Sequence, residues 1–288
     1  MPELPEVETT RRGVEPWASG ATLEAVRVHN RALRWPVDIP GEIIGATINR
    51  VIRRGKYLLF RFDQGTLIIH LGMSGSLRVL TQAGPLLKHD HVEFVLASSE
   101  HSVLIRFNDP RRFGCVLFQP GDRPDSHPLL RHLGVEPLSN EFSGDLLFKL
   151  SRKRKVAVKN FIMDAKIVVG VGNIYASEAL FMAGIRPTVP AGKVTRSAFA
   201  DLAASVRQVL SDAVRQGGTT LRDFVGSDGK PGYFKQSLRV YGREGEACRV
   251  CESALKGVIV GNRSSVYCPI CQKRSGFRKP VVDRPSSA

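Results

Sequence analysis

The sequence has no long hydrophobic run: no stretch of its 288 residues approaches the roughly 18 apolar residues that a membrane-spanning helix needs. Its first residues carry charges where a secretory signal peptide would have an apolar segment. Cysteine is scarce, with five in the chain, and no internal repeat is visible. These absences argue against a membrane protein or a disulfide-stapled secreted one, and predict a cytosolic protein of about two domains.

Acidic residues are too few to balance the basic ones. The chain has 42 Lys and Arg against 27 Asp and Glu, a formal net charge of +15. Such an excess would attract a polyanion and accelerate encounter with it, so nucleic acid is the first partner to consider. A basic surface that is merely solvated is equally compatible with the composition.

Four of the cysteines form two CxxC pairs in C-x2-C-x16-C-x2-C order: Cys248, Cys251, Cys268 and Cys271. Each CxxC turn presents two thiolates to one ion, and two such turns complete the tetrahedral shell of a structural zinc. A redox dithiol is the alternative, which two matched pairs disfavour. The pattern predicts one Zn²⁺ ion holding a hairpin with Arg263 of "GNRSS" at its tip, while Cys115 stands alone.

Short β-rich runs separated by turn residues extend from Leu23 to about Phe118, which is typical of an antiparallel sandwich or barrel-like domain. After prolines at 120, 124 and 128, apolar residues recur at helical spacing and predict a second, helical domain. Its helical segments are residues 144–164, 173–185 and 195–218. Residues 226–235, "GSDGKPGYFK", are too rich in Gly, Asp and Pro for regular structure and predict a mobile loop.

Several motifs together resemble the bacterial formamidopyrimidine-DNA glycosylases over residues 2 to about 274: "PELPEVETTRRG", "HLGMSG", "KHDH", "DPRRFG", "VVGVGNIYASEALF", "GTTLRDF", "SDGKPGYF" and the cysteine module. The resemblance implies an α+β fold, with an N-terminal helix plus β-sandwich domain and a C-terminal helix-two-turn-helix domain that carries a zinc-binding β-hairpin. The implied boundaries are 1–133, 134–235 with a lesion-recognition loop at 226–235, 236–274, and a disordered tail at 275–288.

The same resemblance implies a bifunctional enzyme of base excision repair. Such enzymes excise 8-oxoguanine and formamidopyrimidines from double-stranded DNA and then cut the abasic strand by β,δ-elimination. The related endonuclease VIII type prefers oxidised pyrimidines and differs from this chain at the N-terminus and in "SDGKPGYF". The purine-directed branch is therefore favoured, acting in the bacterial cytoplasm on nucleoid DNA, with a monomer as the default.

The N-terminus carries the predicted nucleophile. If Met1 is removed, Pro2 becomes a free secondary amine, whose pKa near the α-amino reference of about 7.7–8.0 favours a neutral nucleophile more than a lysine does. Attack on the sugar C1′ would give an iminium, and Glu3 could move protons to and from the ring oxygen. As helix-start residues, Pro5, Glu6 and Glu8 need no catalytic role.

The resemblance assigns further roles. It makes Lys56 and Arg263 catalytic in the elimination steps, although phosphate clamping suits Arg263 better because arginine does not readily give up a proton. DNA contacts fall on His70, His89, Arg111, Arg154, Lys159 and Asn173, where Asn173 is alternatively a helix N-cap. The residues that fill the gap left by an everted nucleotide are Met73, Arg111 and Phe113.

Each of these positions also has an ordinary structural interpretation. Lys56 could be a solvated lysine at a strand end, and Met73 and Phe113 could pack in the core. Asn160 and Phe161 depart from the Pro and Trp that the family pattern leads one to expect, which puts fine DNA contacts in doubt. The rival function is a non-catalytic zinc-ribbon protein that binds nucleic acid, and a nucleophilic Pro2 with Glu3 would distinguish the two.

Overall fold

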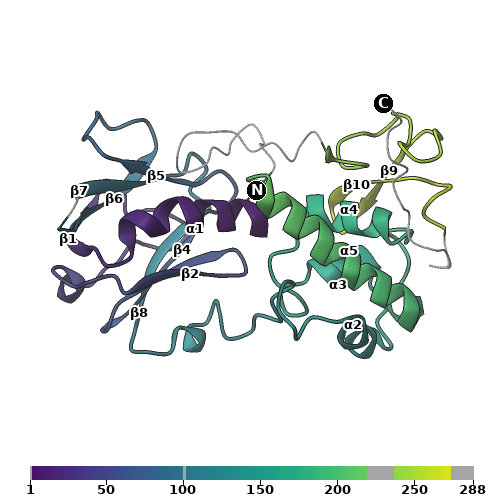
Figure 1. Cartoon of the computed structure of the whole chain (residues 1–288), viewed down its shortest axis with the longest axis horizontal. Helices are drawn as coiled ribbons and strands as arrows, with labels where there is room; N and C mark the ends of the chain where they lie inside the picture. Colours follow the sequence, from purple (N-terminus) through teal and green to yellow (C-terminus); the bar gives the residue numbers. More distant parts are fainter. Residues whose placement is uncertain (1, 100–101, 219–236, 274–288) are drawn as a thin grey trace. The chain divides into compact units, whose positions relative to one another are not determined.

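The computed structural model describes residues 2–99, 102–218 and 237–273, which form two compact units (Figure 1). The first unit contains the described residues up to His132 together with Ala213–Gly218, and the second contains Leu133–Asp212 and the described residues from Ser237. The predicted loop at 226–235 and the predicted tail at 275–288 lie outside the described residues. No helix within these ranges combines the length and the apolar character needed to cross a bilayer.

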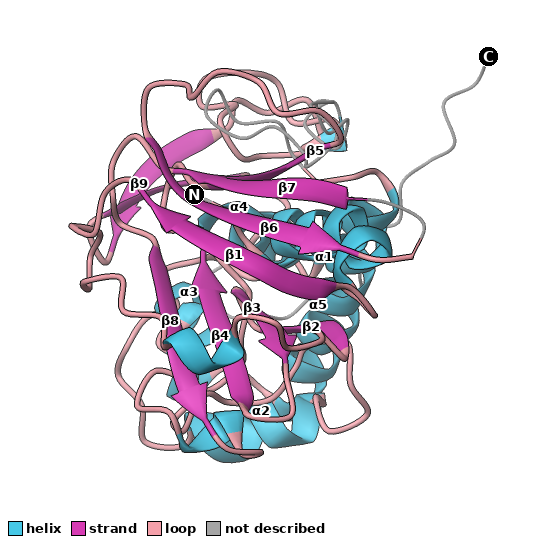
Figure 2. Ribbon diagram, turned by 90° about the vertical axis from the view of Figure 1, so that its left-hand side faces the viewer, coloured by secondary structure: helices cyan, strands magenta, loops and turns pink. Residues whose placement is uncertain are grey.

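The first unit is a helix packed with two antiparallel four-stranded sheets, as the alternating sequence pattern predicts (Figure 2). The helix, α1, spans Leu4–Ala18. One sheet has the order β1-β6-β7-β5, with β1 at Thr22–Val28, β6 at Asp90–Ala97, β7 at Ser102–Asn108 and β5 at Ser76–Leu80. The other has the order β2-β3-β4-β8, with β2 at Arg50–Arg54, β3 at Tyr57–Arg61, β4 at Gly65–His70 and β8 at Cys115–Pro120.

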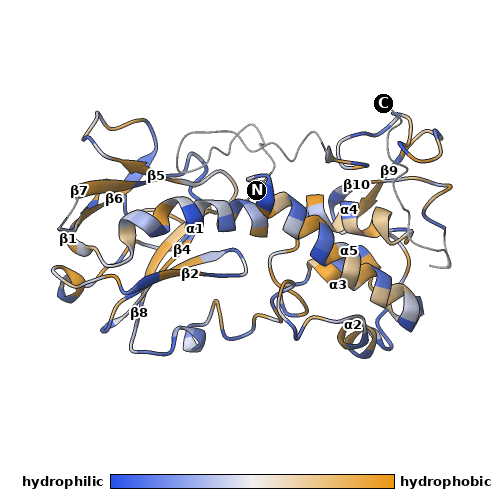
Figure 3. Cartoon of the chain, viewed as in Figure 1, coloured by the Kyte–Doolittle hydropathy of each residue, from blue (hydrophilic) through white to orange (hydrophobic). Residues whose placement is uncertain are grey.

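A single apolar core joins these elements. Val7 and Val14 of α1 pack with residues of both sheets, including Ile69 of β4 and Phe107 of β7. The hydrophobic residues of β4 are orange in Figure 3, and the strand is buried along almost its whole length. Short 3-10 turns lie in the connections, η1 at Gly41–Ile43 and η2 at Pro124–Ser126. The sandwich predicted for this part of the chain is confirmed.

The second unit is helical with one β-hairpin. Its helices are α2 (Gly144–Ser151), α3 (Val158–Met163), α4 (Asn173–Met182) and α5 (Arg196–Arg215), of which the part up to Asp212 belongs to this unit, with a 3-10 turn η3 at Ala191–Lys193. The hairpin pairs β9 (Lys256–Val260) with β10 (Arg263–Tyr267). Residues 144–164 do not form one helix, because the chain leaves α2 at Arg152 and Lys153 adopts a left-handed φ of 63°. Four consecutive basic residues lie in this break, where solvent screens their repulsion.

Candidate active site and metal centre

Pro2 and Glu3 are held at the beginning of α1. Pro2 is buried, Glu3 is 2% exposed, and the backbone N–H of Glu3 donates to the Glu6 carboxylate at 2.9 Å. Gly218 lies so close to Glu6 that a Cβ there would be 2.9 Å from Oε1 of that carboxylate. Pro5 lies in the first helical turn, so Pro5 and Glu6 have the helix-start roles expected of them. Pro2 and Glu3 precede that helix at a defined position.

Glu8 links the first helix to the turn that carries Lys56. Its carboxylate contacts Arg11 at 2.9 Å and Arg53 Nε at 3.3 Å, and burial of Glu8 is outweighed by these cations and Arg12, so its pKa is lowered. Arg53 also donates from Nη1 to the carbonyl of Gly55 at 3.0 Å. Half-buried Lys56 follows directly and precedes β3, so its turn is anchored to α1.

His70 ends β4 as a neutral ring. Its pKa is lowered to about 4 by burial and by the positive charges of Lys56 and Arg34. Nδ1 accepts a hydrogen bond from the backbone N–H of Gly72 at 2.9 Å, so the neutral ring carries its proton on Nε2. The Tyr57 ring lies 4.8 Å from the His70 ring, between centroids. His70 can therefore donate one hydrogen bond without bringing a charge.

The predicted gap-filling residues lie on two loops of the first unit. Met73 is half-buried in the loop between β4 and β5, and Arg111 and Phe113 lie in the loop between β7 and β8. Phe113 is 44% exposed, so it does not pack in the core, and the Arg111 guanidinium lies 5.0 Å from its ring centroid. His89 directly precedes β6 and has a left-handed φ of 74°.

In the second unit, two predicted DNA contacts support the zinc hairpin. Lys159 is fully buried, and its ammonium donates to Ser265 Oγ at 2.6 Å and to the Ser264 carbonyl at 3.4 Å. Asn173 Nδ2 donates to the same Ser264 carbonyl at 3.1 Å. Asn173 is the first residue of α4 and Gly172 is the N-cap, so the N-cap interpretation of Asn173 is wrong by one residue. Neither side chain is the solvated surface residue that composition alone suggests.

Arg263 is exposed at the start of β10, directly after a two-residue turn. Gly261 and Asn262 have φ values of 56° and 59°, which suits a tight hairpin turn. A Cβ at Gly261 would lie 2.7 Å from Asn160 Oδ1, so the family departure at Asn160 packs against this turn. Arg154, the remaining predicted contact, is exposed between α2 and α3.

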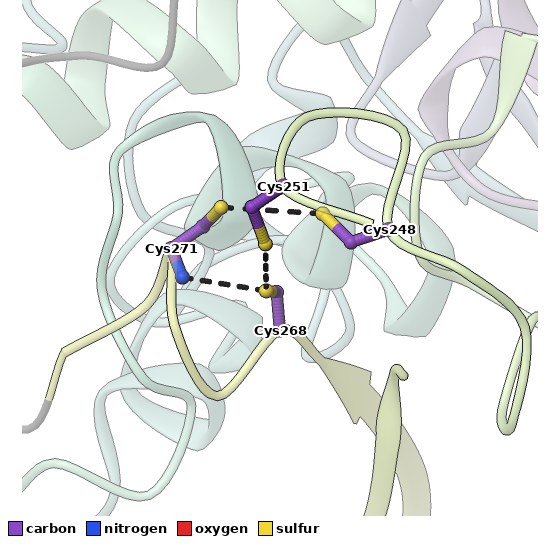
Figure 4. Close-up of side chains that lie close together, drawn as sticks. All are labelled: Cys248, Cys251, Cys268 and Cys271. Atoms are coloured by element: carbon purple, nitrogen blue, oxygen red, sulfur yellow. Dashed lines mark hydrogen bonds between the residues drawn. The ribbon is translucent and has the colours of Figure 1, made fainter. Parts of the chain in front are cut away.

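The four cysteine sulfurs converge on one point (Figure 4). All lie within 4.8 Å of one another; Cys248 and Cys271 are 3.9 Å apart and Cys251 and Cys268 3.4 Å. Zinc–sulfur bonds of about 2.3 Å in a tetrahedron require sulfurs about 3.8 Å apart. The backbone N–H of Cys271 donates to the Cys268 sulfur at 3.3 Å. The set fits a closed structural zinc site.

One supporting carboxylate was missed in the sequence. Glu178 of α4 is 1% exposed and accepts from the backbone N–H groups of Arg239, Val240 and Tyr241 at 2.8–2.9 Å. Burial raises its pKa despite these hydrogen bonds. The signal was a lone acid in the largely apolar "NIYASEALF", which indicates a buried acceptor. Glu178 fixes the segment that leads into the cysteine module.

Comparisons with known proteins agree with this fold. Residues 1–116 match the formamidopyrimidine-DNA glycosylase N-terminal domain, and residues 133–225 match the formamidopyrimidine-DNA glycosylase H2TH domain. Formamidopyrimidine-DNA glycosylases of Hahella chejuensis and Thioalkalivibrio sulfidiphilus are each 56% identical over 275 residues, 95% of this chain and 100% of theirs. The crystal structure of MutM (Fpg) from Thermus thermophilus is 38% identical, with a TM-score of 0.83 over 94% of this chain and 98% of its own.

The sandwich, the helical unit and the four-cysteine hairpin together define a DNA glycosylase of the helix-two-turn-helix class. The chain belongs to the formamidopyrimidine-DNA glycosylase family. It is an enzyme, a DNA glycosylase with abasic lyase activity, and its cysteines hold one structural zinc. The rival interpretation as a non-catalytic zinc-ribbon protein is not favoured.

Proposed function

We propose that this chain excises oxidised purines from double-stranded DNA through Pro2 and then cleaves the abasic strand. Pro2 and Glu3, buried at the pinned start of α1, are the observation that carries the assignment of the nucleophile. Solved relatives support the substrate class: a Lactococcus lactis Fpg mutant is bound to DNA containing Fapy-dG, with 32% identity and a TM-score of 0.86 over 94% of this chain and 100% of its own. A MutM structure holds DNA with carbocyclic 8-oxo-G.

The reaction follows from the chemistry of a secondary amine. The Pro2 nitrogen lone pair bonds to C1′ while the bond between C1′ and the base breaks, and the base leaves with that electron pair and takes up the proton that the Pro2 nitrogen loses. Glu3 delivers a proton to the ring oxygen, the sugar opens, and the nitrogen carries the positive charge of an iminium. Loss of a C2′ proton then sends electrons toward that nitrogen, and the 3′-phosphate departs. Loss of a C4′ proton then expels the 5′-phosphate, and hydrolysis of the iminium releases Pro2.

Other residues take part by position and charge. Lys56, on the turn anchored to α1, is the proposed proton donor near the lesion phosphate, and Arg263 is the proposed phosphate clamp in the δ-elimination. The proposed DNA contacts are His70, His89, Arg111, Arg154 and Asn173, whereas fully buried Lys159 is proposed to act indirectly, by holding the hairpin that carries Arg263. Met73, Arg111 and Phe113 are proposed to fill the gap left by the everted nucleotide, which offsets the cost of a few kcal/mol for unstacking it.

The proposed division of labour follows the predicted domains, 1–133 for catalysis, 134–235 for lesion and DNA binding, and 236–274 for the zinc hairpin. Since the substrate is chromosomal DNA, the enzyme is proposed to act in the cytoplasm at the nucleoid. Oxidised pyrimidines are a second candidate substrate, because a Lactococcus lactis Fpg structure also holds DNA with that lesion. Single-turnover excision of 8-oxoguanine and of an oxidised pyrimidine by this chain decides between them.

Borohydride trapping tests the nucleophile. Reduction should fix the iminium on a duplex with 8-oxoguanine, and mass spectrometry of the adduct should place the sugar on Pro2. Acetylation of the amine should abolish trapping, whereas Pro2→Gly, which leaves a primary amine, should retain a residue of it. Pro5→Ala, in the same helix start, is the matched control and should trap normally. Full activity in a preparation that retains Met1 would refute the role of Pro2.

A further inference from the structure

Asp109 lies between β7 and the loop that carries Arg111 and Phe113, and it is fully buried. Its carboxylate accepts three hydrogen bonds: Oδ1 from Ser74 Oγ at 2.7 Å and from the Arg111 N–H at 3.3 Å, and Oδ2 from the Gly114 N–H at 2.8 Å. Both oxygens of one side chain are thus engaged by two separate loops.

The backbone of Asp109 engages a third segment. Its N–H donates to the carbonyl of His89 at 3.1 Å, and its own carbonyl accepts from Nε2 of His91 at 2.8 Å and from the Arg112 N–H at 3.2 Å. One residue therefore contacts the segment with His89, the loop with Met73 and the loop with Arg111 and Phe113. These segments are far apart in sequence and meet here because β5, β6 and β7 pair in one sheet.

The loops at 72–75 and 110–114, called the wedge loops below, are also in direct contact with each other. Ser74 Oγ, which donates to Asp109, accepts from the Arg111 N–H at 3.2 Å. A Cβ at Gly72 would lie 2.6 Å from the Phe113 carbonyl carbon, and one at Gly114 would lie 2.6 Å from the carbonyl oxygen of His70, the last residue of β4 before the first loop. Glycine at both positions permits this close approach, and Asp109 supplies the polar contacts that hold it.

We propose that Asp109 is a positioning residue that holds the wedge loops together, so that Met73, Arg111 and Phe113 enter the base stack as one preassembled unit. The inference rests on the proposed function of that triad. With no exposed surface, Asp109 cannot itself contact DNA, and its effect passes through the loops. A preassembled wedge does not have to order two loops at the moment of base eversion, which removes a conformational cost from that step.

Asp109→Asn tests this at nearly constant volume. An amide can present only one acceptor oxygen, so its NH₂ group faces either the Gly114 N–H or the donors from Ser74 and Arg111. Asp63→Asn is the matched control, because Asp63 is exposed in the same unit and accepts from Asn49 at 2.7 Å, away from the wedge loops.

The assay separates wedge insertion from chemistry. A 2-aminopurine beside 8-oxoguanine in a duplex brightens when the stack is opened, and stopped-flow fluorescence follows that step. Asp109→Asn should slow the fluorescence rise and duplex excision at least tenfold. Borohydride trapping on a single-stranded abasic oligonucleotide has no stack to fill and should stay within twofold of wild type. Asp63→Asn should match wild type in both.

The other possible results of these assays also decide whether Asp109 positions the wedge loops. An unchanged fluorescence rise in Asp109→Asn would overturn the inference, and equal losses on both substrates would reduce Asp109 to a folding residue. If Asp109→Asn does not fold, Ser74→Ala decides, because it removes one hydroxyl contact and should slow insertion two- to fivefold with trapping preserved; no slowing there also overturns it. Failure of wild type to trap at all would refute the proposed function instead.

Discussion

Gly72→Ala should destabilise the first unit more than the same substitution at a turn glycine whose added Cβ would meet no other atom. Gly72 has a φ of +63°, a conformation that costs an L-residue about 1–2 kcal/mol. An added Cβ would also lie 2.6 Å from the Phe113 carbonyl carbon and meet the backbone of Gly114, neither of which can rotate away. Overpacking of this kind costs about 1–3 kcal/mol. The free energy of unfolding should therefore fall by about 2–5 kcal/mol.

Gly121→Ala provides the matched control. Gly121 has a φ of +81°, but nothing lies within 4 Å of a Cβ built there. Its alanine variant incurs the backbone cost of about 1–2 kcal/mol without the collision. The difference between the two variants isolates the steric contact between the wedge loops.

Urea unfolding followed by tryptophan fluorescence measures this difference in the right part of the molecule. The chain has two tryptophans, Trp17 and Trp35, and both belong to the first unit. Trp17 packs against the core that joins α1 to the sheets, so its emission reports the loss of that core. Equal destabilisation by Gly72→Ala and Gly121→Ala would show that the wedge loops separate freely, and would refute the argument from close approach.

The zinc site, His70 and Glu178 each give a further prediction. Cys268→Ser should release zinc, measured with a chromogenic chelator, and weaken binding to a lesion duplex; unchanged affinity after confirmed zinc loss would show that the hairpin is not a DNA clamp. Because the His70 pKa is about 4 in the folded chain and 6.5 in the unfolded one, the unfolded chain binds the proton first and stability should fall by about 3 kcal/mol from pH 6.5 to 4. His70→Gln should flatten that decline in urea titrations, whereas exposed His132→Gln should not. Glu178→Ala leaves three N–H groups without their acceptor and should cost about 2–5 kcal/mol, seen by circular dichroism; a loss below about 1 kcal/mol would contradict this role.

The parts of the molecule that the sequence predicted are those specified by local spacing. Two CxxC pairs at this spacing are typical of a four-cysteine zinc site, and the distances between the sulfurs agree with such a site. Short β-rich runs between turn residues likewise specified the sandwich, whose strands contribute to one shared core. The proposed nucleophile also depends only on local order, since Pro2 directly follows Met1.

Contacts between distant segments could not be predicted in this way. Lys159 ends a run of basic residues that suggests a solvated surface, yet α3 begins only at Val158 and turns that one ammonium onto Ser265. Packing decides which face of a short helix is buried after an irregular turn, and the charge pattern does not encode that packing. Asp109 was overlooked for a similar reason, because its partners come from three segments that meet only after the strands pair.

Cys115 should react with oxidants differently from the four zinc cysteines, because the pKa of its thiol is raised. Burial raises its pKa to about 12, so only about one molecule in 10⁵ carries a thiolate there at pH 7. The thiolate is the form that peroxides and alkylating reagents attack. Cys115 should thus stay reduced among the oxidants that damage DNA bases, whereas the other four cysteines become open to oxidation once they lose the zinc. Thiol reagents applied before and after chelation should count none and then four reactive cysteines in the folded chain.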